Sequence, residues 1–237
     1  MNRKLIIFFV AMIFVIVNGG LSFAIGESTV SVTAKVSKTV TPDIAYLIIS
    51  VETKAKTSKE AMDENSRKMA AAIKSLSICL NKNNGDKIET EQLRVSPEYS
   101  YKNNETLLVG YNASNTIRIK TKNLNKVSEI VNLALENGAS SLNSLQFKIE
   151  DYSKYSTELT IQSVKMAKQK AETMAQALNE QLAKVKTIST YSNFDESVNC
   201  MEKMVRVGVS RSPSPEIPLF PEEINLEATT NAEFYLK

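Results

Sequence analysis

The stretch "VSVTAKVSKTVTPDIAYLIISVET", Val30 to Thr53, decides the class of fold. Its first seven residues alternate valine or alanine with polar residues, which is the period-two pattern of a half-buried β-strand. Thr41-Pro42-Asp43 then predicts a tight turn, because proline is preset for the second position of a turn. From Ile44 to Thr53 apolar residues occupy both faces. We therefore expect this second strand to lie in the middle of a sheet and to be covered on both sides.

Three helices are expected further along the chain. Thr57 and Glu60 have the spacing of a capping box, so the first helix should begin there. Its apolar stripe is interrupted by Asn65, which we interpret as a buried asparagine that hydrogen-bonds a loop, with a ligand contact as the less favoured alternative. The second helix should run from Asn123 to Asn137, and the third from about Ser156 to Asn179. The side of the third helix expected to pack carries Val164, Ala167, Ala171, Ala175 and Leu178.

A tyrosine-rich stretch, "PEYSYKNNETLLVGYNASNT" (Pro97–Thr116), follows the first helix. Alternation predicts two strands joined by residues 102–108, with three tyrosines on the same side as the aliphatic residues. We therefore expect these rings to face a core or a contact with another subunit. Pro97 cannot donate to a strand ladder, so it should lie at a sheet edge or a bulge. The candidate self-association residues of this hairpin are Pro97, Tyr99, Tyr101, Leu107, Leu108 and Tyr111.

The rest of the chain completes an α+β fold. Strands are expected at Leu145–Ile149, Val185–Tyr191 and Leu226–Leu236. A proline-rich irregular loop at about residues 195–223 precedes the last of them. The fold class we expect is antiparallel β-sheets with about three helices packed on sheet faces, in which the N- and C-terminal strands are adjacent.

The first 24 residues have the pattern of a signal peptide. Arg3 and Lys4 precede the apolar run Leu5–Val17, and small residues lead up to an expected cleavage site after Ala24. An uncleaved anchor is less favoured, because this run is shorter than the roughly 20 residues of a membrane-spanning helix. We therefore expect an extracytoplasmic protein, secreted, periplasmic or associated with the cell envelope, with no membrane span after cleavage.

Charge and composition exclude several classes of partner and catalytic site. Removing Arg3 and Lys4 from 29 basic side chains leaves 27 against 26 acidic ones, so nucleic acid is not an expected partner. The sequence has no histidine, which excludes Ser-His-Asp and Cys-His catalysis and argues against a catalytic zinc site. Acidic residues that are adjacent in sequence point apart on a helix or strand, whereas acid–base catalysis needs carboxylates that converge. Such pairs are Asp63-Glu64, Asp195-Glu196 and Glu222-Glu223. We expect no enzymatic activity, no cofactor and no metal.

The chain has two cysteines, Cys79 and Cys200. An oxidising compartment permits a disulfide between them. The alternative that we favour is a pair of unpaired thiols, because Cys79 falls on the apolar face of the first expected helix, where free cysteine often packs as a small hydrophobe.

Several segments in this order resemble the SIMPL-domain family, a group of exported bacterial proteins with eukaryotic relatives. The similarity spans residues 29 to 237. It is carried by "VTPDIA" (Val40–Ala45), "AMDENSRKM" (Ala61–Met69), "VSPEYSY" (Val95–Tyr101), "GYNASNTIRI" (Gly110–Ile119), "NGASSLNSLQF" (Asn137–Phe147) and "AKQKAETMAQAL" (Ala167–Leu178). The chain departs from the family pattern at "NKNNGDKI" (Asn81–Ile88), where a Gly-Ile pair is usual.

The resemblance implies a periplasmic or envelope protein. Some members of the family are immunogenic, some are linked to defence against oxidative stress, and at least one relative assembles into a large hollow ring. No catalytic residues are established for the family. We therefore expect an exported, non-enzymatic homo-oligomer that self-associates through sheet edges and the tyrosine-rich hairpin. The alternative function is an extracytoplasmic binding module for a small ligand or peptide.

Overall fold

The computed structural model of the protein describes residues 27–102, 104–194, 198–199 and 221–237. Its strands are β1 (Thr29–Val40), β2 (Ile44–Ala55), β3 (Lys87–Lys102), β4 (Glu105–Thr121), β5 (Ser141–Lys148), β6 (Leu182–Asn193), β7 (Val198–Asn199) and β8 (Ile224–Leu236). Its α-helices are α2 (Ser58–Leu76), α3 (Val127–Glu136) and α4 (Ser153–Ala177). The expected signal peptide, residues 1–24, and most of the proline-rich loop at residues 195–223 lie outside the described residues.

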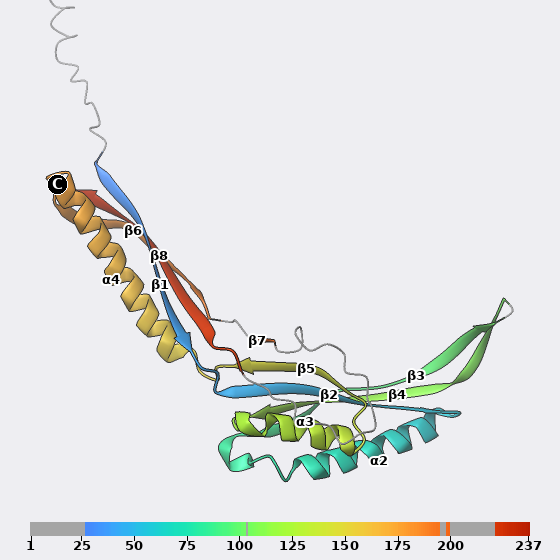
Figure 1. Cartoon of the computed structure of the whole chain (residues 1–237). Helices are drawn as coiled ribbons and strands as arrows, with labels where there is room; N and C mark the ends of the chain where they lie inside the picture. Colours follow the sequence, from blue (N-terminus) through green and yellow to red (C-terminus); the bar gives the residue numbers. More distant parts are fainter. Residues whose placement is uncertain (1–26, 103, 195–197, 200–220) are drawn as a thin grey trace, which may run out of the picture. The chain divides into compact units, whose positions relative to one another are not determined.

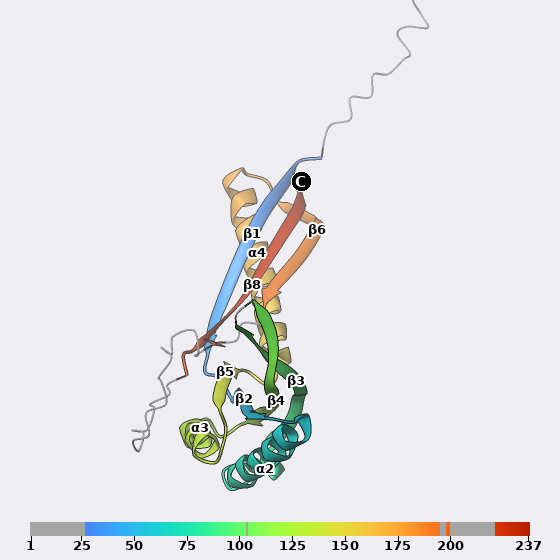
Figure 2. The same ribbon diagram turned by 90° about the vertical axis from the view of Figure 1, so that its right-hand side faces the viewer.

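The strands form two antiparallel sheets. One has the order β1-β8-β6 and the other the order β3-β4-β2-β5-β7. The expected α+β class is confirmed, and so is the adjacency of the terminal strands, because β8 lies between β1 and β6 (Figure 2).

The chain divides into two compact units. The smaller unit contains the start of β1 up to Thr33, together with Ala167–Ser189 and Asn231–Lys237. In this unit polar side chains join β1 to β8. Thr29 Oγ1 donates to Glu233 Oε1 at 2.8 Å, and Thr33 Oγ1 donates to Asn231 Oδ1 at 2.8 Å.

The small residues of α4 pack as the sequence predicts. Ala167, Ala171 and Ala175 are buried, which lets the helix backbone come close to its neighbours. The prediction is wrong for Leu178, which is 63% exposed because α4 ends one residue earlier, at Ala177.

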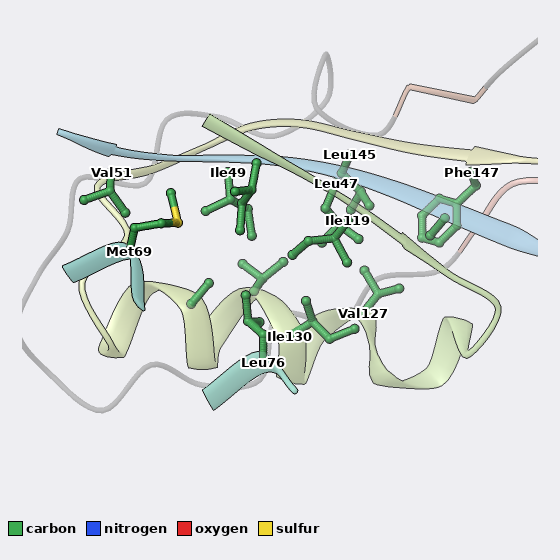
Figure 3. Packing of buried hydrophobic residues seen from close by; sticks show 14 residues of the cluster. Leu47, Ile49, Val51, Met69, Leu76, Ile119, Val127, Ile130, Leu145 and Phe147 are labelled. Atoms are coloured by element: carbon green, nitrogen blue, oxygen red, sulfur yellow. The ribbon is translucent and has the colours of Figure 1, made fainter. Parts of the chain in front are cut away.

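The larger unit comprises Ala34–Met166 and Thr190–Thr230 and contains the five-stranded sheet. The central strand β2 pairs with β4 on one side and with β5 on the other. Helices α2 and α3 lie on the same face of this sheet (Figure 1). Figure 3 shows the core between them, where side chains from the sheet meet side chains from both helices. The residues of β2 that point into this core are Ala45, Leu47, Ile49 and Val51, all 1% exposed or less.

The expectation that β2 is covered on both sides is wrong for the face opposite the helices. The strand is central, as predicted, but the two helices cover only one of its faces. On the other face Ile44 is buried, whereas Tyr46 and Ile48 are only half-buried.

Helix α2 begins where the capping box predicts. Glu60 N–H donates to Thr57 Oγ1 at 3.2 Å, and Thr57 N–H donates to Glu60 Oε2 at 3.3 Å. Two backbone donors that the first helical turn leaves unpaired are satisfied in this way. The helix start is therefore fixed three residues after the end of β2 at Ala55.

Asn65 is fully buried on the core-facing side of α2. Its Nδ2 donates to the carbonyl oxygens of Val51 at 2.8 Å and Ala113 at 2.9 Å. The interpretation as a buried asparagine is confirmed, although its partners are carbonyls of β2 and β4 rather than of a loop.

Candidate functional site

The β3–β4 hairpin continues beyond the rest of its sheet. β2 ends at Ala55, which pairs with Tyr111, so the part of β4 before Tyr111 pairs only with β3. We call residues 98–102 of β3, Asn104 and residues 105–110 of β4 the arm. Figure 1 shows both strands running on together past the ends of β2 and α2.

The arm carries apolar side chains on both of its faces. The large ones are between 50% and 70% exposed: Tyr99, Tyr101, Leu107, Leu108 and Val109. Residues directly opposite each other in an antiparallel pair share a face. Tyr99 lies opposite Leu108, and Leu107 lies opposite Ser100 on the other face. A flat partner surface would therefore cover only part of this apolar area.

The tyrosines lie on the predicted side of their strands, but Tyr99 and Tyr101 contact no core among the described residues. Pro97 pairs with Tyr111, and two residues further along β4 comes Ala113, which is buried under α2. Tyr99 and Tyr101 continue the same face beyond the ends of β2 and α2, where they are 60% and 70% exposed. The expectation of a core contact is wrong for these two rings, and Tyr111 is half-buried. A contact with another subunit stays a prediction.

Pro97 lies where its missing N–H does least harm. The strand β3 is the edge of the five-stranded sheet, as the sequence predicts, and a register shift follows directly between Glu98 and Tyr99. At an edge a proline removes no ladder bond to a second neighbour and discourages pairing with a further strand.

The base of the arm is built around Gly110 and Val109. A Cβ atom on Gly110 would lie 2.7 Å from the carbonyl oxygen of Ala55, so only glycine lets β4 pass this close to the end of β2. Val109 is the extra residue at the register shift, because Glu98 pairs with Gly110 while Tyr99 pairs with Leu108. A bulge of this kind bends a strand and increases its twist. Neither feature was predicted from the sequence, although a glycine inside a strand pattern is the signal for them.

The tip of the arm is polar. Lys102 pairs with Glu105, so the strands extend further than the expected 102–108 connection allows. Asn104 has φ of 67°, in the left-handed region that asparagine tolerates, and its Oδ1 accepts a 2.8 Å bond from the Tyr101 hydroxyl. The ring of Tyr101 is therefore held beside the tip.

Cys79 lies just beyond the end of α2 and is half-buried against the core. Its Sγ donates to Glu129 Oε1 at 3.2 Å. Partial burial raises the pKa of the thiol, and the Glu129 carboxylate raises it further, so the thiolate is disfavoured. Cys200 lies outside the described residues, so both the disulfide and the pair of free thiols stay predictions.

The sequence matches a known protein family over most of its length. Residues 30–234 match the SIMPL family model, whose description is "Protein of unknown function (DUF541)". The chain belongs to the SIMPL family.

Two named bacterial proteins are similar in sequence to this SIMPL chain. It is 25% identical to the 26 kDa periplasmic immunogenic protein of Brucella melitensis over 88% of this chain and 84% of the relative. It is 26% identical to the uncharacterized protein YggE of Escherichia coli K12 over 66% of this chain and 63% of that protein.

Among the described residues, no helix is both long enough and apolar enough to cross a membrane.

Proposed function

We propose that this SIMPL protein is exported and non-enzymatic, and that it assembles with further copies of itself through the arm. The observation that carries the proposal is the apolar surface of the arm, which no described part of the chain covers. Apolar area left in water costs about 25 cal/mol per Å², and exposed clusters of this kind commonly mark interaction sites.

The order of residues along the arm favours a protein partner over a lipid one. Lys102 and Glu105 sit at the tip, ahead of the leucines and tyrosines. Insertion into a bilayer would bury these charges first, which is costly. A groove formed by other copies contacts the apolar middle of the arm on both faces and leaves the polar tip in water.

Three observations support a non-enzymatic role. The sequence has no histidine. Asp63 and Glu64 pair with different lysines, Lys59 and Lys68, so these adjacent carboxylates do not converge. No group of three or more histidine, cysteine or acidic side chains that could hold a metal ion occurs within residues 27–102, 104–194, 198–199 and 221–237.

Export and a role in stress defence complete the proposal. The expected signal peptide at residues 1–24 and the printed name of the Brucella relative both support an extracytoplasmic location. The link to oxidative stress rests on the family resemblance alone. Capture of a small ligand, the alternative function, finds support on the face of the five-stranded sheet opposite α2 and α3 rather than on the arm.

Light scattering on the purified protein tests self-assembly. The wild-type protein should form an oligomer, and the double variant Leu107→Ser, Leu108→Ser should raise the dissociation constant at least tenfold. Each substitution removes about 1–2 kcal/mol of apolar burial at the contact. The matched control is Ile78→Ser, which replaces an 82% exposed apolar residue away from the arm and should leave assembly unchanged. A wild-type protein that is strictly monomeric at high concentration, or a double variant that assembles like the wild type, would overturn the proposal.

A further inference from the structure

The face of β2 opposite α2 and α3 carries an apolar stripe among polar neighbours. We call Ile44, Tyr46 and Ile48 the Tyr46 stripe. On the two flanking strands, Tyr46 lies between Lys120 and Gln146. Ile48 lies in the same way between Arg118 and Ser144. Cations of β4 therefore border the stripe on one side, and amide and hydroxyl groups of β5 border it on the other.

The stripe forms the floor of a cavity of about 360 Å³. Arg118, Gln146, Lys148 and Glu150 are among the residues of its wall. Sites for small molecules occupy about 300–1,000 Å³ and combine an apolar floor with a few polar groups that orient the ligand. The cavity is at the lower end of this range, so it fits a small molecule rather than a folded partner.

The charges around the cavity are paired, with one exception. Arg118 binds Glu91, and Lys120 and Lys122 both bind Glu150. Within the described part of the chain, the ammonium group of Lys148 has no carboxylate partner. The cavity therefore offers one ammonium group without a carboxylate partner beside an apolar floor.

We infer that this cavity binds a small organic anion, with its apolar body on the Tyr46 stripe and its anionic group at Lys148. Gln146 and Ser144 supply hydrogen-bonding groups on the β5 side. The Lys148 charge complements the anion, while burial of the half-exposed Tyr46 and Ile48 side chains supplies apolar contact. The inference is independent of the arm and of self-assembly.

Two dyes of nearly the same shape test this inference on the purified protein. The anionic probe is 8-anilinonaphthalene-1-sulfonate, and N-phenyl-1-naphthylamine is its uncharged analogue. Lys148→Gln should weaken binding of the anionic dye about tenfold and leave the neutral dye unaffected. Ile48→Asn should weaken binding of both dyes. The matched control is Lys87→Gln, which removes a cation from an exposed position in β3 of the same sheet and should change neither.

Three results would overturn the inference. The first is an anionic-dye affinity that Lys148→Gln leaves unchanged or that Lys87→Gln lowers equally. The second is loss of binding only when Leu107 and Leu108 are replaced by serine, which would place the dye on the arm. The third is a tenfold gain in affinity when residues 200–220 are replaced by a glycine–serine linker of equal length, which would make this segment of the chain the occupant.

Discussion

Asn65 holds two strands of the sheet to one helix through a single side-chain amide. Because both of its acceptors are backbone carbonyls of buried residues, Asn65→Ala removes two buried hydrogen bonds. The loss is moderated because Asn65 Oδ1 itself has no donor among the described residues. We expect the free energy of unfolding to fall by about 2–4 kcal/mol in urea denaturation.

An exposed asparagine provides the control for this change. Asn225→Ala removes an amide on the surface of β8 and should cost less than about 0.5 kcal/mol. Equal losses for the two variants would contradict the role assigned to Asn65.

The contribution of the Glu150 side chain to stability depends on pH. A hydrogen-bonded ion pair with Lys120, and a second with Lys122, lower the pKa of this carboxyl from 4.5 to about 2. A carboxyl whose pKa is lower in the folded state stabilises that state above pH 4.5, and the contribution disappears as the pH falls toward 2. Glu150→Gln should therefore be less stable than the wild type at pH 7 and equal to it near pH 2, as measured by urea denaturation. A difference that stays the same at both pH values would show that the ion pairs do not cause it.

The base of the arm depends on the glycine at position 110. Gly110→Ala places a Cβ atom 2.7 Å from the Ala55 carbonyl oxygen, so the end of β2 or the base of the arm must shift. We expect a loss of about 1–3 kcal/mol in the free energy of unfolding and faster hydrogen exchange at the amides of Ala55 and Tyr111. Ser100→Ala, on an exposed position of the arm, is the control and should leave exchange unchanged. Unchanged exchange in Gly110→Ala would show that the base of the arm has room for a side chain.

The alternation of residues along a strand predicts the face on which a side chain lies, but it does not predict what covers that face. It correctly assigned Tyr99 and Tyr101 to the face that also carries Ala113, because alternation fixes sides. It did not show that β2 and α2 stop before the rings do, since coverage depends on the lengths of elements that are distant in sequence. The bulge at Val109 was missed for a related reason: an extra residue in one strand is visible only against its partner.

At the scale of the whole molecule, local signals were sufficient for the class of fold. The capping box at Thr57 and the alternation in the terminal strands agree with the structure, and residues 41–43 separate β1 from β2. The coverage of β2 was not predictable, because a strand that is apolar on both faces looks the same whether protein or another occupant lies over the second one. The cavity at the Tyr46 stripe was missed for this reason, since its walls come from β4 and β5.

The position of β8 between β1 and β6 also bears on how the chain folds. β3 and β4 are joined by a short connection and can pair as soon as both have been made, whereas β1 finds its neighbour only in the last described strand. Contacts between segments so far apart in sequence form slowly, because a long loop must close first. During synthesis β1 therefore remains unpaired until residues 224–236 have been made. A chain truncated before Ile224 lacks the central strand of the three-stranded sheet rather than an edge strand.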